Sequence, residues 1–148
     1  MYPGKYALTH PDRAAFIMAG SGITVSYAEF EARSNQLAHF LSAQGLGFQD
    51  HYSIFMENNE RYMESCAAGE RSGLYYTCIN SYLTGDELAY IVNNSESKVL
   101  ITSKSKIDVV AEALTSCPNI QMVLVTDAGD VQLPEAMVDF STAVNGCS

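Results

Sequence analysis

Basic residues are scarce in this chain of 148 residues. Lysine and arginine together number 8, against 17 aspartates and glutamates, and the formal net charge is −9. Proteins bind nucleic acids and anionic membranes through clustered cations, which displace counterions from the partner. Outside Lys98, Lys104 and Lys106 the positive charges are thinly spread, so the composition argues against a nucleic-acid partner.

Long apolar runs are absent too. No stretch approaches the roughly 20 apolar residues that a membrane-spanning helix requires. Residues 1–6 lack the basic and then apolar pattern of a signal peptide. We therefore expect no transmembrane segment and a cytoplasmic location.

Closely spaced cysteines are the third absence. Cys66, Cys78, Cys117 and Cys147 are scattered, with no Cys-x-x-Cys pair and no histidine at short spacing. In a chain of this size the pattern predicts buried free thiols in a reducing compartment, not a disulfide framework or a zinc site.

The length and composition are those of about one globular domain. A chain of this length buries on the order of 70% of its unfolded surface. Apolar residues make up 47% of the chain and charged residues only 17%. This low charge fraction suggests that part of the apolar surface is covered by something outside the chain.

Four apolar strands separated by helices dominate the chain from residue 51 onward. The strands are centred near Ile54, Tyr76, Leu100 and Leu124. Continuous apolar strands joined by helices predict an α/β fold with a largely parallel sheet and helices on both faces. The expected parts of the chain are a hairpin plus helix over residues 1–50, βα repeats over 51–126 and a weakly structured end over 127–148. The end shows only a weak helical pattern, at Met137, Val138 and Phe140.

A β-hairpin and a helix precede the repeats. Two short apolar segments flank Gly20 and Gly22, which suit a tight turn. The alternative, a phosphate-binding loop, is disfavoured because no Lys-Ser or Lys-Thr follows and the next element is a strand. Ser26 and Glu29 have the spacing of a capping box, and Gly45 is placed to end the helix that they begin.

The rest of the chain is organised around residues 72–88. Gly73 is placed to end a helix in the left-handed conformation, a buried strand follows over residues 74–79, and Thr84 caps the next helix. Gly69, inside the preceding helix, costs about 1 kcal/mol relative to alanine, which predicts close packing against a neighbouring element. None of these residues is an obvious nucleophile, base or metal ligand.

The sequence leads us to assign no catalytic, cofactor-binding or metal-binding residue. Ligands of parallel sheets lie beyond the carboxyl ends of the strands. Polar runs occur there at residues 57–59, 80–81 and 102–105. Ser103 and Ser105 allow two interpretations: capping of the next helix, which we favour, or an anion site at its N-terminus. Tyr62 and Met63 either line a ligand pocket or, as we favour, pack in the core.

Three stretches contain recognisable motifs. The first is I-T-V-S-Y-A-E-F at residues 23–30, followed by R-S-N-Q-L-A at 33–38. The second is E-R-S-G-L-Y-Y-T-C-I-N at residues 70–80. The third is L-T-G-D-E-L-A-Y-I-V-N-N at residues 83–94, with K-V-L-I-T at 98–102. Together, in this order, they resemble the N-terminal region of the adenylate-forming superfamily, which includes acyl-CoA synthetases, the adenylation domains of nonribosomal peptide synthetases and firefly luciferases.

The resemblance covers about residues 8–126 and is greatest to bacterial fatty-acyl-CoA ligases. It implies a parent enzyme that uses ATP and Mg²⁺ to convert a carboxylic acid to an acyl-adenylate, and then transfers the acyl group to coenzyme A. One departure is that the family usually has a proline near the end of the second stretch, where this chain has residues 77–80.

The catalytic motifs that the family implies have no counterpart in these 148 residues. They are a Ser/Thr/Gly-rich loop ending in Pro-Lys, a Tyr-Gly-x-Thr-Glu segment, a ribose-binding aspartate and a lysine in a small C-terminal domain. We therefore expect an incomplete N-terminal portion of the large domain, inactive and without a bound cofactor when alone. Its expected partner is the remainder of the parent polypeptide.

Other interpretations remain open. The chain could be a non-catalytic, flavodoxin-like binding or interaction domain. Incomplete sheets with exposed edges would favour self-association. The parent enzyme, expected in the cytoplasm, could also lie at a membrane surface.

Overall fold

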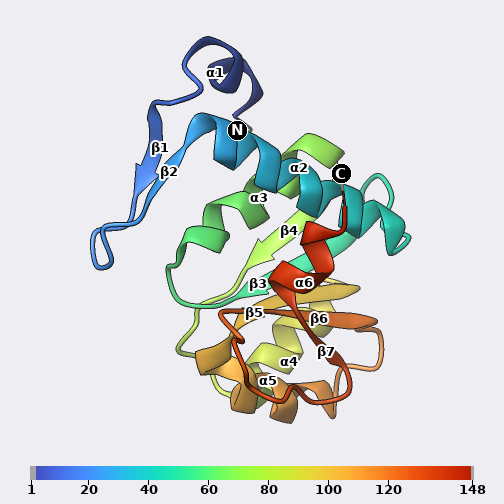
Figure 1. Ribbon diagram of the computed structural model, residues 1–148. Coiled ribbons are helices and arrows are strands. Elements are labelled where there is room, and N and C mark those ends of the chain that lie inside the picture. The colour runs from blue at the N-terminus through green and yellow to red at the C-terminus, as the bar shows by residue number, and fades with distance from the viewer. Residues whose placement is uncertain (1–2, 148) are drawn as a thin grey trace.

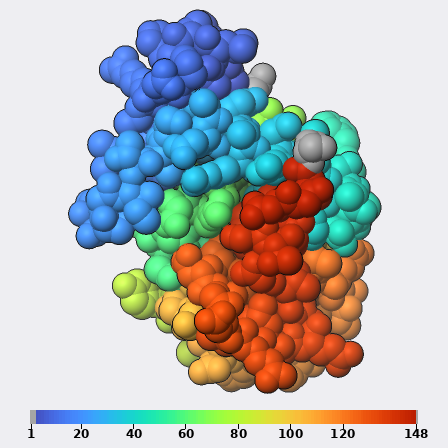
Figure 2. All heavy atoms as spheres, viewed as in Figure 1, coloured from blue at the N-terminus to red at the C-terminus, as the bar shows by residue number. Residues whose placement is uncertain are grey.

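The structure is a computed structural model and describes residues 3–147. It opens with α1 (Gly4–Thr9), which the sequence pattern did not predict, and a hairpin of β1 (Ala14–Ile17) and β2 (Thr24–Ser26). The two strands are antiparallel, as predicted. Figure 2 shows α1 and the hairpin projecting from the body of the molecule.

The long helix α2 (Tyr27–Ala43) follows the hairpin directly. Its capping box is confirmed: the Ser26 N–H donates to Glu29 Oε2 over 2.9 Å, and the Glu29 N–H donates to Ser26 Oγ over 3.2 Å. Gly45, just beyond the helix, has a φ of +87°. The chain therefore leaves α2 in the left-handed conformation that was expected of this glycine.

A five-stranded parallel sheet forms the centre of the molecule, in the order β4-β3-β5-β6-β7. Its strands are β3 (His51–Phe55), β4 (Tyr75–Cys78), β5 (Val99–Ser103), β6 (Met122–Thr126) and β7 (Met137–Asp139). The connecting helices are α3 (Glu60–Ser72), α4 (Gly85–Asn94), α5 (Ile107–Leu114) and the terminal α6 (Phe140–Asn145). The predicted parallel α/β architecture is thus confirmed.

Helices cover both faces of the sheet (Figure 1). On one face α2, α3 and α6 pack against side chains that include Tyr52, Ile54 and Leu124. On the other face α4 and α5 pack against Leu100 and Val123, among others. Successive strand residues point to opposite faces, and apolar side chains on both faces give the sheet two separate cores.

The predicted turn and cap within residues 72–88 are confirmed, but the strand between them is not buried: β4 lies at the edge of the sheet, and Tyr75 and Cys78 are exposed. Gly73 ends α3 with a φ of +70°, and Thr84 and Glu87 form a capping box at the start of α4. A Cβ atom on Gly69 would lie 2.5 Å from Tyr52 Oη and 2.8 Å from a ring carbon of Tyr76. Gly69 therefore allows α3 to lie directly on the rings of the two neighbouring strands.

The end of the chain differs from the short helix suggested by the sequence. Met137 and Val138 lie in β7, which pairs with β6, and the helix begins only at Phe140. Asp139 caps that helix by accepting the Thr142 N–H over 2.7 Å. Neither element is long enough for its periodicity to be read from the sequence. Figure 1 shows α6 folded back toward α2.

Within the described residues, 3–147, no helix combines the length and hydropathy needed to cross a bilayer.

Candidate functional site

The candidate site lies where β3 and β5 run side by side at the carboxyl edge of the sheet. From β3 the chain first adds β4 on one side and then crosses to add β5 on the other. This reversal is a topological switch point, the usual place for a ligand in an open α/β sheet. Polar side chains from both strand ends meet there.

Glu57, just after β3, binds the hydroxyls that follow β5. Ser103 Oγ donates to Glu57 Oε2 over 2.5 Å, and Ser105 Oγ donates to the same oxygen over 2.9 Å. The two hydroxyl oxygens are 3.1 Å apart. Ser103 makes no side-chain cap hydrogen bond to the turn that follows it. The capping interpretation of Ser103 and Ser105 is therefore wrong: both hydroxyls donate to Glu57, and α5 begins after Lys106 without a side-chain cap hydrogen bond.

Carboxylates and cations both lie at this edge. Burial raises the pKa of the Glu57 carboxyl, but hydrogen bonds from Ser103, from its own backbone and from Ser105 outweigh that effect and leave the pKa below its ordinary value. Partial desolvation, Glu60 and Glu57 together raise the pKa of Asp127, which follows β6. An ionised Glu57 at the switch point repels phosphate, whereas Lys106 lies close enough to lower the Glu57 pKa, so the alternative of an anion site at residues 103–105 stays a prediction.

A second polar contact joins the ends of β3 and β6. Asn59 caps α3 by accepting the Arg61 N–H over 2.9 Å, and its amide donates to Thr126 Oγ1 over 3.1 Å. The side chains at this edge thus bind one another and fix the strand ends. The described residues include no group of three or more His, Cys, Asp and Glu side chains that could hold a metal ion.

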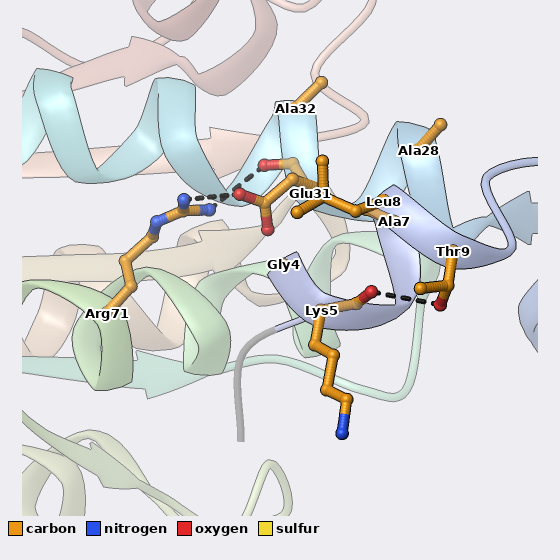
Figure 3. Close-up of a pocket in the computed structure, with 9 residues that line it drawn as sticks. All are labelled: Gly4, Lys5, Ala7, Leu8, Thr9, Ala28, Glu31, Ala32 and Arg71. Carbon is orange, nitrogen blue, oxygen red and sulfur yellow. Dashed lines mark hydrogen bonds and ion pairs between the residues drawn. The ribbon is translucent and has the colours of Figure 1, made fainter.

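A groove of about 720 Å³ lies on the other side of the molecule, between α1, α2 and the end of α3. Figure 3 shows Arg71 pointing at Glu31, while the Lys5 ammonium points away from it. The Arg71 guanidinium donates to Glu31 Oε1 over 2.6 Å and to Ser34 Oγ over 2.8 Å. Much of the remaining lining consists of small or aliphatic side chains, including Leu8. The ion pair joins α2 to α3, and we ascribe to it a structural role.

A smaller cavity of about 260 Å³ lies between the hairpin, α2 and α3. Met63 lines it, together with aromatic rings that include Phe16 and Phe30. Met63 is 49% exposed, so the prediction that it packs in the core is wrong, whereas Tyr62 does pack against the core beneath α2. Met63 faces the hairpin side of α3, which the helical pattern alone did not distinguish from the sheet side.

Comparisons with known proteins give the family. The profile of the family described as "AMP-binding enzyme" matches residues 5–144. The chain belongs to the AMP-binding enzyme family.

Curated relatives of this AMP-binding chain include CoA ligases. It is 34% identical over 119 residues to a 3-oxocholest-4-en-26-oate–CoA ligase of Rhodococcus rhodochrous, a match that covers 80% of this chain and 21% of the relative. It is 30% identical, with the same coverage, to a medium/long-chain-fatty-acid–CoA/3-oxocholest-4-en-26-oate–CoA ligase of Mycobacterium marinum. The chain thus spans about a fifth of the length of these relatives.

A solved structure shares the fold of the AMP-binding chain. A putative long-chain-fatty-acid CoA ligase from Rhodopseudomonas palustris matches with a TM-score of 0.85 at 23% identity. The match covers 97% of this chain and 35% of that one. The described sheet and helices therefore correspond to one part of a larger AMP-binding ligase fold.

The cluster around Glu57 was missed by the sequence analysis. The signal available was an acid directly after one strand and two hydroxyls directly after another. Using it requires knowing that β3 and β5 are neighbours, although β4 lies between them in the sequence.

Proposed function

We propose that this chain forms the amino-terminal part of an ATP-dependent carboxylic-acid–CoA ligase that makes an acyl-adenylate and then an acyl-CoA. The observation that supports this most is the similarity to CoA ligases over 119 residues. The fatty-acid class of substrate rests on the activity for which the Mycobacterium marinum relative is named. ATP, Mg²⁺ and coenzyme A are then the cofactors of the whole enzyme, and the cytoplasm is its proposed location.

The role proposed for residues 3–147 is that of a scaffold. The hydroxyls of Ser103 and Ser105 hold Glu57 between the strand ends, and the described residues include no His, Cys, Asp and Glu group that could hold a metal ion for a nucleotide. Stabilising a transferred adenylyl group requires positioned cations and backbone donors. We infer that the remainder of the polypeptide supplies these groups, and we derive no catalytic step through the residues of this chain. The proposed division into residues 1–50, 51–126 and 127–148 belongs to this one partial domain.

Pyrophosphate release tests the proposal. The 148-residue chain is incubated with ATP, Mg²⁺ and fatty acids of several lengths, with the Rhodococcus relative as the active control. We expect no release above background from the isolated chain. We also expect acyl-CoA formation once the chain is extended by its own downstream coding sequence. Robust turnover by the isolated 148 residues would contradict the scaffold role, and an extended chain without activity would contradict the ligase.

The strand order favours one second candidate, a non-catalytic flavodoxin-like domain. That fold binds flavin phosphate at the same switch point. The ionised Glu57 carboxylate at the switch point opposes this role, because like charges repel. Titration with flavin mononucleotide, followed by its fluorescence, separates the two proposals: saturable binding by the chain favours the second, and no binding favours the first.

Self-association is a proposed property of the isolated chain. The edge strand β4 exposes Tyr75, and the hairpin strand β1 exposes Ile17. Unpaired strand edges with exposed apolar side chains favour pairing between copies. We expect size-exclusion chromatography to show concentration-dependent association, and a monomer that is stable on dilution would count against this proposal.

A further inference from the structure

Two cysteines from different elements meet beside the edge strand. Cys66 lies on α3 and Cys78 at the end of β4, and their Sγ atoms are 3.9 Å apart. Both are free thiols; Cys66 is half-buried and Cys78 is exposed. The expectation that all cysteines are buried is therefore wrong for Cys78. The turn at Gly73 produces this contact, since it brings β4 back alongside α3.

The surroundings make the two sulfurs unequal. The Cys66 thiol and the Tyr62 hydroxyl hydrogen-bond to Cys78 and lower the pKa of its thiol to about 6. The same bond to Cys78, together with burial, raises the pKa of the Cys66 thiol. An exposed sulfur with a lowered pKa thus lies next to a half-buried thiol with a raised pKa.

We propose that Cys66 and Cys78 form a reversible disulfide on exposure to hydrogen peroxide, so that this pair is an oxidative modification site. The Cys78 thiolate attacks one oxygen of the peroxide, and the O–O bond breaks. Cys78 sulfenic acid forms, and the hydroxide that leaves takes up a proton to become water. Cys66 then attacks the Cys78 sulfur, the S–O bond breaks, and the second oxygen leaves as water with the Cys66 proton. The two thiols lose two electrons and the peroxide gains them.

The geometry permits this bond with small movements. A disulfide requires a separation of about 2 Å between sulfurs, so the two atoms must approach by roughly 2 Å from their observed contact. Cys78 is exposed at the end of an edge strand, so its side chain has room to rotate. The bond would tie the sheet edge to α3.

The other two cysteines serve as internal controls. Cys117 is buried, and burial raises the pKa of its thiol. Its Sγ contacts the Ala89 carbonyl oxygen rather than a second sulfur. Cys147 is half-buried near the end of α6. Neither combines exposure with a neighbouring thiol in the described residues, so oxidation is expected to be selective.

Mass spectrometry of the intact, folded 148-residue chain tests the proposal. The reduced chain is treated with a small excess of hydrogen peroxide, quenched by alkylation and mapped without reduction. We expect an intramolecular Cys66–Cys78 cross-link with the loss of two hydrogen atoms, formed before Cys117 or Cys147 is modified and reversed by dithiothreitol. Equal oxidation of all four cysteines, or Cys78 cross-links only between chains, would overturn it.

Matched variants test the order of the steps. In Cys66→Ser we expect Cys78 to accumulate as a sulfenic acid that dimedone labels. In Cys78→Ser, Cys66 should stay reduced at the same peroxide dose. Cys117→Ser should oxidise like the parent chain. Circular dichroism establishes that each variant is folded before treatment. Absence of dimedone labelling in a folded Cys66→Ser chain, or labelling of Cys66 in a folded Cys78→Ser chain, would contradict the assignment of Cys78 as the attacking thiol.

Discussion

Replacing Gly73 tests the conformation that joins α3 to β4. Its φ is +70°, and a side chain in this left-handed region costs about 1–2 kcal/mol for an L-residue. A Cβ atom there would also lie 2.7 Å from the Phe48 ring, but that ring is 79% exposed and can turn aside at little cost. Backbone strain therefore dominates, and Gly73→Ala should lower the free energy of unfolding by about 1–2 kcal/mol. Gly73→Val should lower it further, because β-branched residues tolerate positive φ poorly.

Two other glycines provide matched controls. Gly45 has a φ of +87° with no atom near the added Cβ, so Gly45→Ala reports strain without the ring contact. Gly146 has a φ of −79° and the same open surroundings, so Gly146→Ala reports the chain-entropy effect alone, which is stabilising by about 0.4–1 kcal/mol. Urea unfolding followed by circular dichroism measures all four variants. If Gly73→Ala and Gly146→Ala had equal stabilities, the strain argument would be refuted.

Two further substitutions on α3 test its packing and the ionisation of a buried carboxyl group. Gly69→Ala should destabilise the chain by about 1–3 kcal/mol in the same assay despite the better helix propensity of alanine, because the new methyl group overlaps the buried Tyr52 ring; a stabilised variant would contradict this. Burial raises the pKa of Glu64 from 4.5 to about 7, against the opposing effect of Arg61. As pH rises, Glu64 therefore ionises first in the unfolded chain. Between about pH 4.5 and pH 7 this group lowers the free energy of unfolding by about 3 kcal/mol. Glu64→Gln should remove this contribution, so the stability difference between parent and variant must change across that range; a constant difference would exclude the raised pKa.

Much of the local structure followed from the sequence because its causes are short-range. A capping box depends on residues three positions apart, as at Ser26 and Thr84. The left-handed conformation of Gly73 depends on the helix that it ends. Continuous apolar strands likewise determined that the sheet is parallel and covered on both faces. Short terminal elements were the exception, since β7 is stabilised by pairing with β6 rather than by its own pattern.

Contacts between residues that are distant in the sequence could not be predicted from such local patterns. Glu57 binds hydroxyls 46 and 48 positions away, and the Cys66 and Cys78 sulfurs approach only after the turn at Gly73. Met63 lies toward the hairpin and not the sheet, although it belongs to the same helix as buried residues.

The sequence by itself determined most of the central helices and strands, the caps at Ser26 and Thr84, and the family to which the chain belongs. Only the tertiary structure decided the strand order, which places β5 beside β3 and β4 at the edge. The physical reason is that caps and periodic burial depend on neighbours within one or two turns, whereas strand order depends on how all helices share the two faces of the sheet. That order decides that Glu57 accepts hydrogen bonds from the hydroxyls of Ser103 and Ser105 and that Cys78 is left exposed beside Cys66.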